Sequence, residues 1–227
     1  MRFPDAGFMM TGNSKPNFLR DGYDAVADEY AERIFNELDH KPLDRELLAR
    51  FVERVGFGRC CDLGCGPGHV ARYLHDLGAN VTGIDLSPRM VELARSLSPG
   101  IEFQQGDMTD LRPAGLPWAG IVAFYSIIHI PRKQVTDLLR GLRQTLSPSG
   151  LLLLSFHIGR GTDHKDEWWG KSVSVDFHFF EADEMEGYLK AAGFEIEESI
   201  ERPPYEGVEF PSRRAYIFAS RPPLDQA

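Results

Sequence analysis

The stretch CCDLGCGPGHVARYL, residues 60–74, contains the residues whose spacing most clearly indicates chemistry. A hydrophobic run ends in Asp62, and Gly64, Gly66 and Gly68 follow before a helical pattern begins. Glycines at such a turn let the backbone come very close to a ligand. The spacing departs from the G-x-G-x-x-G of dinucleotide-binding turns, and a carboxylate beside the turn disfavours a pyrophosphate. The pattern favours a ligand with an adenosine end and a positive centre.

Two more acids continue this pattern. Asp85 closes the strand predicted at 80–86, where a carboxylate can accept hydrogen bonds from both hydroxyls of a ribose. Asp107 closes the strand predicted at 101–107. Ligands of open parallel sheets bind at the carboxyl ends of the strands. Three consecutive strands that end in acids therefore predict one binding site.

Histidines supply the candidate general bases, because imidazole titrates near neutral pH. His129 follows the predicted strand 118–126, and His157 ends the predicted strand 151–157. Both positions fall where a second ligand should lie, and both are predicted to be catalytic. The alternative for each is an orienting or packing role.

A polar and aromatic insert, residues 158–180, interrupts the pattern of strands and helices. A loop of this length inside a domain is more often functional than idle. We expect it to cover the second ligand through Trp168, Trp169 and His178, with Tyr205 and Glu209 approaching from the same side. The alternative is a surface excursion that packs on itself.

Alternating strands and helices are the elements that must position these residues. Such alternation predicts an α/β fold with a doubly wound, mostly parallel seven-stranded sheet and helices on both faces. The last two strands have no helix between them, so the last strand is expected to be antiparallel. The predicted strands cover 59–63, 80–86, 101–107, 118–126, 151–157, 194–200 and 214–220.

The same pattern predicts one domain with short flanking tails. The domain is expected over residues 21–220, with a helical cap at 21–56 and the insert at 158–180. Residues 1–20 are expected to be a mobile tail, and residues 221–227 a second tail. The N-terminus lacks the apolar run of a signal peptide, and no segment is long enough to cross a bilayer.

Composition limits the partners and the compartment. The 25 Lys and Arg residues against 34 Asp and Glu residues give a net charge of −9, which disfavours nucleic acid and anionic membranes. Cys60, Cys61 and Cys65 match no metal or disulfide pattern, so reduced thiols in a cytoplasmic protein are expected. No metal site is predicted. The oligomeric state stays open.

The set of motifs resembles the class I S-adenosylmethionine-dependent methyltransferases of the small-molecule type. The matching segments are DLGCGPGHVARYL at 62–74, VTGIDLSPRMVELA at 81–94 and GDMTDL at 106–111. The resemblance extends over about residues 21–220. Tyr125 and Ser126 stand where metal-dependent members of the family carry acids, so the resemblance favours a metal-independent enzyme.

The resemblance implies S-adenosylmethionine as the cofactor and a role for each strand end. The backbone of Gly64, Cys65 and Gly66 would pack on the methionine part, beside Asp62, and Asp85 would hold the ribose. The other implied contacts are Leu86, Gly106, Asp107 and Met108 around the adenine, Tyr125 beside the transferring methyl group, and Tyr23 and Tyr30 closing over the cofactor. Tyr125 is thereby also a predicted catalytic residue.

Purely structural roles for these residues stay open as alternatives. Asp85 could cap the following helix, Asp107 could be a turn residue, and Tyr23 and Tyr30 could be core residues on one helix face.

The predicted function is methyl transfer to an oxygen or nitrogen of a small-molecule acceptor, without a metal. The alternatives are a nicotinamide-dependent oxidoreductase and a protein that binds S-adenosylmethionine without catalysis. The sequence does not identify the acceptor.

Overall fold

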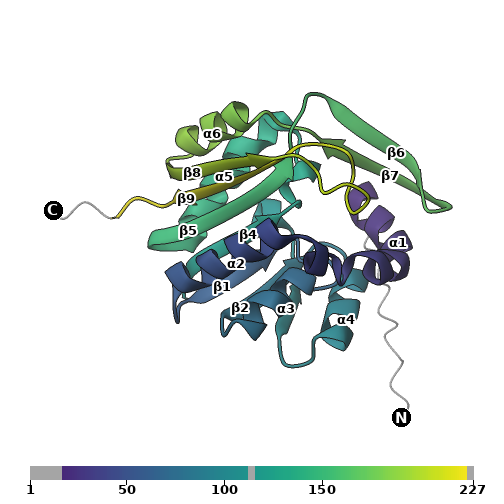
Figure 1. Ribbon diagram of the computed structural model, residues 1–227, viewed down its shortest axis with the longest axis horizontal. Helices are drawn as coiled ribbons and strands as arrows, with labels where there is room; N and C mark the ends of the chain where they lie inside the picture. Colours follow the sequence, from purple (N-terminus) through teal and green to yellow (C-terminus); the bar gives the residue numbers. More distant parts are fainter. Residues whose placement is uncertain (1–16, 112–115, 224–227) are drawn as a thin grey trace, which may run out of the picture.

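The computed structural model describes residues 17–111 and 116–223 and is organised around one seven-stranded sheet (Figure 1). The strand order is β3-β2-β1-β4-β5-β9-β8. All neighbouring pairs are parallel except those of β9, which runs antiparallel to β5 and β8. The strands are β1 (Arg59–Leu63), β2 (Asn80–Asp85), β3 (Glu102–Gln105), β4 (Trp118–Phe124), β5 (Leu146–His157), β8 (Glu195–Arg202) and β9 (Arg214–Ser220). The predicted fold class is confirmed.

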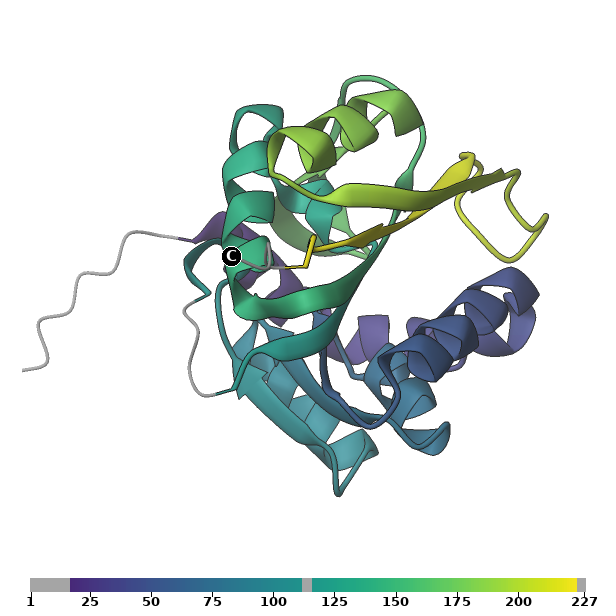
Figure 2. The same cartoon turned by 90° about the vertical axis from the view of Figure 1, so that its left-hand side faces the viewer.

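Helices cover both faces of the sheet (Figures 1 and 2). Helices α5 and α6 pack in one hydrophobic core, and α2, α3 and α4 pack in the other. The α-helices are α1 (Phe18–Ile34), α2 (Pro42–Val55), α3 (His69–Asp76), α4 (Pro88–Leu97), α5 (Arg132–Thr145) and α6 (Ala182–Ala191), and the 3-10 turns are η1 (Glu37–His40), η2 (Met108–Asp110) and η3 (Ile127–His129).

Strand β5 shows how the sequence builds both cores. Leu152 and Leu154 belong to the core of α5 and α6, whereas Leu151 and Leu153 belong to the opposite core. Successive side chains of a strand point to opposite faces, so a strand that is covered on both sides is apolar throughout. The four consecutive leucines at 151–154 therefore reflect burial of β5 on both of its faces.

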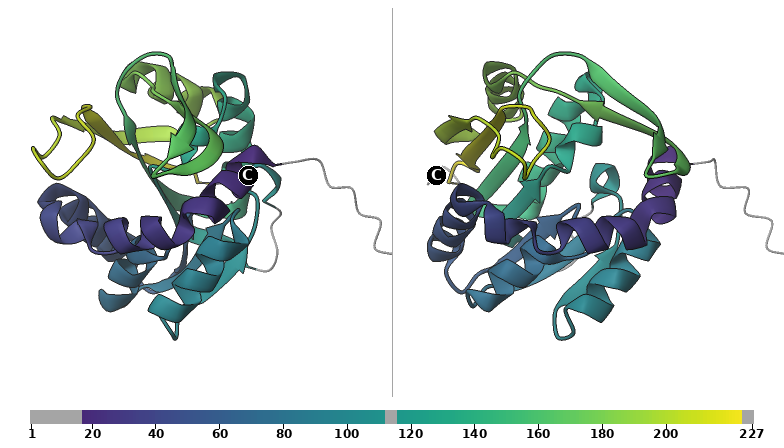
Figure 3. Two further views of the ribbon diagram at one scale, coloured as in Figure 1. Left: turned by 90° about the vertical axis from the view of Figure 1, so that its right-hand side faces the viewer. Right: turned by 45° about the vertical axis from the view of Figure 1, so that its right-hand side comes forward.

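The predicted insert contains a two-stranded hairpin of β6 (Thr162–Trp168) and β7 (Lys171–His178). Trp169 and Gly170 form its turn, and both have positive φ angles, as two-residue hairpin turns require. The hairpin reaches across to α1 (Figure 3). A Cβ atom on Gly22 of α1 would lie 2.6 Å from Cγ2 of Val175 of β7, so the two elements are in close contact.

The two predicted tails fall largely outside the described residues, at 1–16 and 224–227. Helix α1 begins at Phe18, inside the predicted N-terminal tail, because Asn17 caps it by accepting a hydrogen bond from the Arg20 backbone N–H at 3.1 Å. Among the described residues, no helix combines the length and the apolar character needed to cross a bilayer.

Candidate active site

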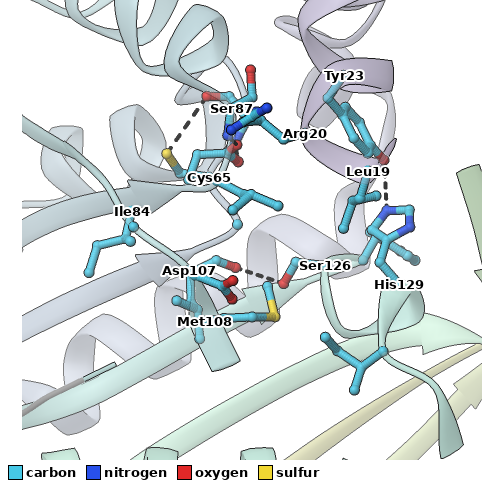
Figure 4. A pocket seen from close by; sticks show the side chains of 18 of the residues that line it. Leu19, Arg20, Tyr23, Cys65, Ile84, Ser87, Asp107, Met108, Ser126 and His129 are labelled. Atoms are coloured by element: carbon cyan, nitrogen blue, oxygen red, sulfur yellow. Dashed lines mark hydrogen bonds between the residues drawn. The ribbon is translucent and has the colours of Figure 1, made fainter. Parts of the chain in front are cut away.

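The first pocket, which we call the glycine-turn pocket, lies at the carboxyl ends of β1, β2 and β4 (Figure 4). Its volume is about 250 Å³. Gly64 has a φ of +73°, and a Cβ atom there would lie 2.3 Å from the Cβ of Ser126. Gly66 has a φ of +53°, a conformation that favours glycine, and a Cβ atom there would lie 3.8 Å from Cε1 of Tyr30. Only glycine fits these two positions, and the backbone is left accessible to a ligand.

Asp85 is fixed at the end of β2 by backbone donors. Its two carboxylate oxygens accept hydrogen bonds from the N–H groups of Gly66 and Ser87, each at 2.8 Å. Burial raises its pKa to about 6, although these hydrogen bonds act in the opposite direction. The neighbouring Leu86 and the predicted Cys65 also line this pocket.

The end of β3 supplies the opposite wall. Gly106, Asp107 and Met108 all line the glycine-turn pocket. Asp107 also begins η2, where its Oδ1 accepts hydrogen bonds from the Thr109 N–H at 2.8 Å and from the Thr109 hydroxyl at 2.6 Å. Asp107 therefore stabilises the η2 turn and also lines the pocket, where it can contact a ligand.

Asp62 is not among the residues that line the glycine-turn pocket, nor does it line the second pocket described below. Its Oδ2 accepts a hydrogen bond at 2.9 Å from the Ala71 N–H, in the first turn of α3. The first N–H groups of a helix have no partner within the helix, so a carboxylate under α3 satisfies one of them. Burial raises the pKa of Asp62 to about 7. The sequence places this acid beside the glycine turn, but the structure turns its carboxylate toward the helix.

The second pocket, which we call the hairpin pocket, has a volume of about 430 Å³ and adjoins the first. Tyr23, Tyr30, Glu37 and Tyr125 line both pockets and form a shared wall. The rest of the hairpin pocket combines aromatic and charged side chains. The aromatic ones include Trp168, Trp169, Phe177, Phe179, Phe210 and His157, and the charged ones are Lys41, Asp163, Lys165, Glu209 and Arg214.

Helix α1 and the hairpin meet through their aromatic rings. The ring of Trp168 lies 5.4 Å from Tyr23, 5.8 Å from Tyr30 and 5.4 Å from Phe177, in edge-to-face arrangements. Tyr23 and Tyr30 are 5.7 Å apart. The two tyrosines therefore lie on one helix face, as their spacing predicts, and that face lines both pockets.

His129 forms a short hydrogen-bonded chain with Tyr23 (Figure 4). Its Nδ1 lies 2.9 Å from the backbone carbonyl of Asp176, which can only accept, so Nδ1 carries the proton. Its Nε2 then accepts from the Tyr23 hydroxyl at 2.7 Å. Burial lowers the pKa of His129 to about 4, so the ring is neutral at physiological pH.

His157 lines the hairpin pocket but not the glycine-turn pocket. Its Nδ1 lies 2.8 Å from the Ser212 hydroxyl, and its Nε2 makes no hydrogen bond within the described part of the chain. Its ring is 5.2 Å from that of Tyr125. Burial, and then the charges of Arg214 and Lys41, lower its pKa to about 4.

Tyr125 stands between the two pockets in a conformation that non-glycine residues rarely adopt. Its φ is +50°, and its N–H donates to the Ser155 carbonyl at 3.0 Å. Its hydroxyl lies 3.0 Å from that of Tyr216, which donates to Asp44 at 2.6 Å. Tertiary contacts hold the strained residue in place.

Besides Asp62, two further predicted site residues, His178 and Tyr205, lie outside both pockets. His178 pairs through Nδ1 with the Thr162 hydroxyl at 2.7 Å. The Tyr205 hydroxyl accepts from the Leu43 N–H at 3.2 Å, and its ring lies under the Arg202 guanidinium. Sequence reasoning named Glu209 as a residue that approaches the acceptor, but it missed Glu37, Lys41 and Arg214 of the hairpin pocket and gave Asp163 and Lys165 of the insert no role. The one local signal is an arginine that opens the otherwise apolar strand RAYIFAS.

Comparison with known proteins decides the family. Residues 30–199 match the family described as "Methyltransferase domain". The chain belongs to this family. The predicted resemblance, the prediction of a methyltransferase and that of S-adenosylmethionine as cofactor are confirmed, against the oxidoreductase alternative.

Individual relatives match only part of this methyltransferase. It is 32% identical over 121 residues to a malonyl-[acyl-carrier protein] O-methyltransferase of Enterobacter lignolyticus, covering 52% of this chain and 45% of that one. It is 37% identical over 115 residues to a trans-aconitate 2-methyltransferase of Methylobacterium nodulans, covering 47% and 41%. The chain thus spans less than half the length of these two relatives.

A solved structure shows the same fold over most of both chains. The magnesium protoporphyrin IX methyltransferase of Synechocystis PCC 6803, crystallised with bound S-adenosylmethionine, superposes with a TM-score of 0.67 at 21% identity. The match covers 89% of this chain and 94% of the other. Among residues 17–111 and 116–223, no group of three or more His, Cys, Asp or Glu side chains is placed to hold a metal ion.

The position of Asp85 predicts a defined loss of cofactor affinity on substitution. In Asp85→Ala, binding of S-adenosylhomocysteine should weaken by about 2–4 kcal/mol, because a charged acceptor for the ribose hydroxyls is removed. Isothermal calorimetry measures this change. Asp76→Ala, on the exposed face of α3, is the matched control and should bind as the wild type does. Equal affinity in both variants would contradict the assignment.

The raised pKa of Asp85 also predicts a pH dependence. The ionised carboxylate accepts hydrogen bonds from a ribose, so affinity for S-adenosylhomocysteine should fall as the pH drops below about 6 and level off above it. Asp85→Asn does not titrate and should show no such fall, which separates Asp85 from Asp62. A wild-type affinity that stays constant down to pH 5 would be inconsistent with this placement.

Proposed function

We propose that this enzyme transfers a methyl group from S-adenosylmethionine to an oxygen or nitrogen of a small-molecule acceptor, without a metal ion. The wall shared by the two pockets carries the proposal, because a ligand in each pocket would meet its neighbour at Tyr23, Tyr30, Glu37 and Tyr125. The free, buried thiols of Cys60, Cys61 and Cys65 favour a cytoplasmic enzyme. The acidic net charge disfavours nucleic acid or an anionic membrane as a partner.

The residues of the glycine-turn pocket fit this cofactor. Asp85 offers carboxylate oxygens to the ribose, the turn at Gly64 and Gly66 leaves room for the methionine part, and Gly106 to Met108 provide polar groups for the adenine. Glu37 lies at the shared wall, and burial alone would raise its pKa. His69 and Lys41 outweigh burial and lower the pKa to about 2, so this carboxylate stays charged and favours a cationic centre.

The aromatic wall suits a positive centre. When bound, S-adenosylmethionine supplies a sulfonium methyl group that an acceptor lone pair displaces, the carbon–sulfur bonding pair remaining on sulfur. Tyr23 and Tyr30 present aromatic rings at the place where this charge would lie, and aromatic faces attract cations. The ring of Trp168 holds both tyrosines from the hairpin side and so fixes the geometry of the wall.

The chain of Tyr23 and His129 provides a route for the acceptor's proton. A hydroxyl acceptor must lose its proton as its oxygen lone pair forms the new bond, and an ammonium acceptor must lose a proton before its nitrogen has a lone pair to donate. The Tyr23 oxygen would take that proton while the Tyr23 hydroxyl passes its own to His129 Nε2, which is neutral and already accepts from it. The Asp176 carbonyl holds the ring in the tautomer that leaves Nε2 free of a proton. His157 lies away from the glycine-turn pocket and binds the acceptor in this scheme.

The proposed activity is tested by incubating the protein with S-adenosylmethionine that carries a deuterated methyl group and with a library of small hydroxyl and amine compounds. Mass spectrometry should find at least one compound that gains the labelled methyl group. The protein should also bind S-adenosylhomocysteine in excess chelator. Binding without any transfer would support the non-catalytic alternative instead.

The proton route predicts a selective loss of turnover. Tyr23→Phe and His129→Ala should each lower kcat for an acceptor found in this way by about 100- to 10,000-fold, the usual effect of one general base. Affinity for S-adenosylhomocysteine should change little in His129→Ala. His75→Ala, half exposed on α3, is the control. Near-wild-type kcat in both pocket variants would remove the relay and indicate an acceptor that needs no base.

The hairpin predicts a different kinetic effect. Trp168→Ala and Trp169→Ala should raise the KM of the acceptor by about 10-fold, because they remove aromatic surface from its pocket. The value of kcat should change less than KM. Phe57→Ala removes a fully exposed ring elsewhere and should leave both constants unchanged. An unaltered KM in both tryptophan variants would refute the role of the hairpin.

A further inference from the structure

Arg214 gives the hairpin pocket a cationic end. The residue is 2% exposed and lines the hairpin pocket but not the glycine-turn pocket. Its Nη1 donates to the Phe210 carbonyl at 2.8 Å and to the Ser212 carbonyl. Its Nη2 makes no hydrogen bond among the described residues. An arginine with an unused donor at a pocket wall is able to bind an anion.

The carboxylate beside Arg214 is shared with other cations. Glu209 accepts from both Nη atoms of Arg202, at 2.7 and 2.8 Å. Arg214 Nε lies 3.2 Å from the same carboxylate, within ion-pair range but without hydrogen-bond geometry, and Lys41 Nζ lies 3.5 Å away. Glu209 thus pairs with three cations, but Arg202 also pairs with Asp44, and Lys41 also pairs with Glu37. Among the described residues, Arg214 has no second carboxylate partner. Arg214 is only partly compensated on the side that faces the pocket.

His157 adds a second donor at this end. It lies directly across from Arg214 in the register of β5 and β9, and its Nε2 has no partner in the described part of the chain. Ser212 Oγ is 3.5 Å from Arg214 Nη1, which can only donate, so the Ser212 hydrogen is available to His157 Nδ1. In the tautomer in which Ser212 donates to Nδ1, the proton of the neutral ring is on Nε2, which is then free to donate to a ligand.

The electrostatic environment of His157 agrees with this arrangement. After burial, the charges of Arg214 and Lys41 have the largest effects on its pKa, and both lower it. The opposite effects of Glu209 and Glu37 are smaller. The potential at this ring is therefore positive, although the carboxylates are close by.

We propose that the acceptor of this methyltransferase is an apolar molecule bearing a carboxylate, which Arg214 Nη2 and His157 Nε2 bind at the side of the hairpin pocket formed by β5 and β9. The inference rests on the proposed function, because it assumes that the acceptor occupies this pocket. Phe179, Phe210 and Trp168 then pack against the apolar body, and the methyl-accepting atom faces Tyr23. The aromatic rings favour a molecule of roughly phenylalkyl size.

A cationic acceptor is the competing chemistry, since tryptophan and tyrosine rings attract ammonium groups. The ring of Trp169 already carries a cation, because the Arg33 guanidinium lies 4.9 Å from its centre. Away from the shared wall, the carboxylates that line the pocket are Asp163 and Glu209, and both are already paired, with Lys165 and with Arg202. The observations therefore favour the anion.

The experiment compares three probes with one carbon skeleton: 3-phenylpropionate, 3-phenylpropionamide and 3-phenylpropylamine. Each is titrated by calorimetry into the protein saturated with S-adenosylhomocysteine. The carboxylate should bind about 10- to 100-fold more tightly than the amide, as expected for a charge-assisted hydrogen bond, and the amine should bind most weakly. Arg214→Gln should abolish the preference for the carboxylate.

Two milder variants keep the test decisive if Arg214→Gln does not fold. Arg214→Lys keeps the charge but loses the planar guanidinium fork, and His157→Phe removes the imidazole donor; each should reduce the preference for the carboxylate severalfold. Affinity for S-adenosylhomocysteine should be unchanged in both, which shows that the fold is intact. If the wild-type protein does not bind S-adenosylhomocysteine at all, the proposed function itself is refuted.

Several results would overturn the carboxylate proposal while leaving methyl transfer in place. These are equal affinity for carboxylate and amide, tightest binding of the amine, no binding of the carboxylate at millimolar concentration, and an unaltered preference in folded Arg214 and His157 variants.

Discussion

The buried guanidinium of Arg202 is the constraint on which the site depends. It donates to Asp44 of α2 at 2.8 Å and to both carboxylate oxygens of Glu209, in the segment between β8 and β9. Its Nε also donates to the Tyr216 hydroxyl at 2.9 Å. Removing one partner of a buried ion pair typically costs about 3–5 kcal/mol, since a charge is left without compensation. Helix α2, strands β8 and β9 and the connecting segment must therefore meet in one arrangement.

This arrangement positions both sides of the second pocket. Through the Tyr216 hydroxyl, it holds Tyr125 in its left-handed conformation at the wall between the pockets. Through Glu209, it sets the place and the partial compensation of Arg214 and Lys41. The ion pairs and hydrogen bonds of Arg202 thus fix the position of Tyr125, at the wall where the two ligands would meet. They also fix the position of Arg214, where the acceptor would be anchored.

The sequence predicts the sheet well because strand patterns are local. The predicted bounds of 59–63 and 214–220 agree with β1 and β9, and the cap of α4 is Ser87, two residues after Asp85. The direction of a single side chain is not local, so Asp62 is placed beside the turn by the sequence but bonds to α3 in the structure. The hairpin of the insert is polar and lacks a clear apolar alternation, and the sequence therefore predicts only a loop there.

The ion-pair network beside the second pocket escapes sequence analysis for the same reason. Asp44 and Arg202 are 158 positions apart, and each alone reads as an ordinary charge on an amphipathic element. Their pairing follows only from the way in which α2 packs near the end of β8. The partner of His129 is equally distant: Tyr23 lies 106 positions away and is predicted as a cofactor contact rather than as a hydrogen-bond partner.

A crystal structure of the protein with bound S-adenosylhomocysteine tests the central claim most directly, namely that donor and acceptor pockets meet at one aromatic wall. The account predicts that the ribose lies on Asp85, the adenine lies near Asp107 and Met108, and the sulfur faces Tyr23 and Tyr125, toward the hairpin pocket. A cofactor whose sulfur faces away from the hairpin pocket, or which binds outside the glycine-turn pocket, would contradict it.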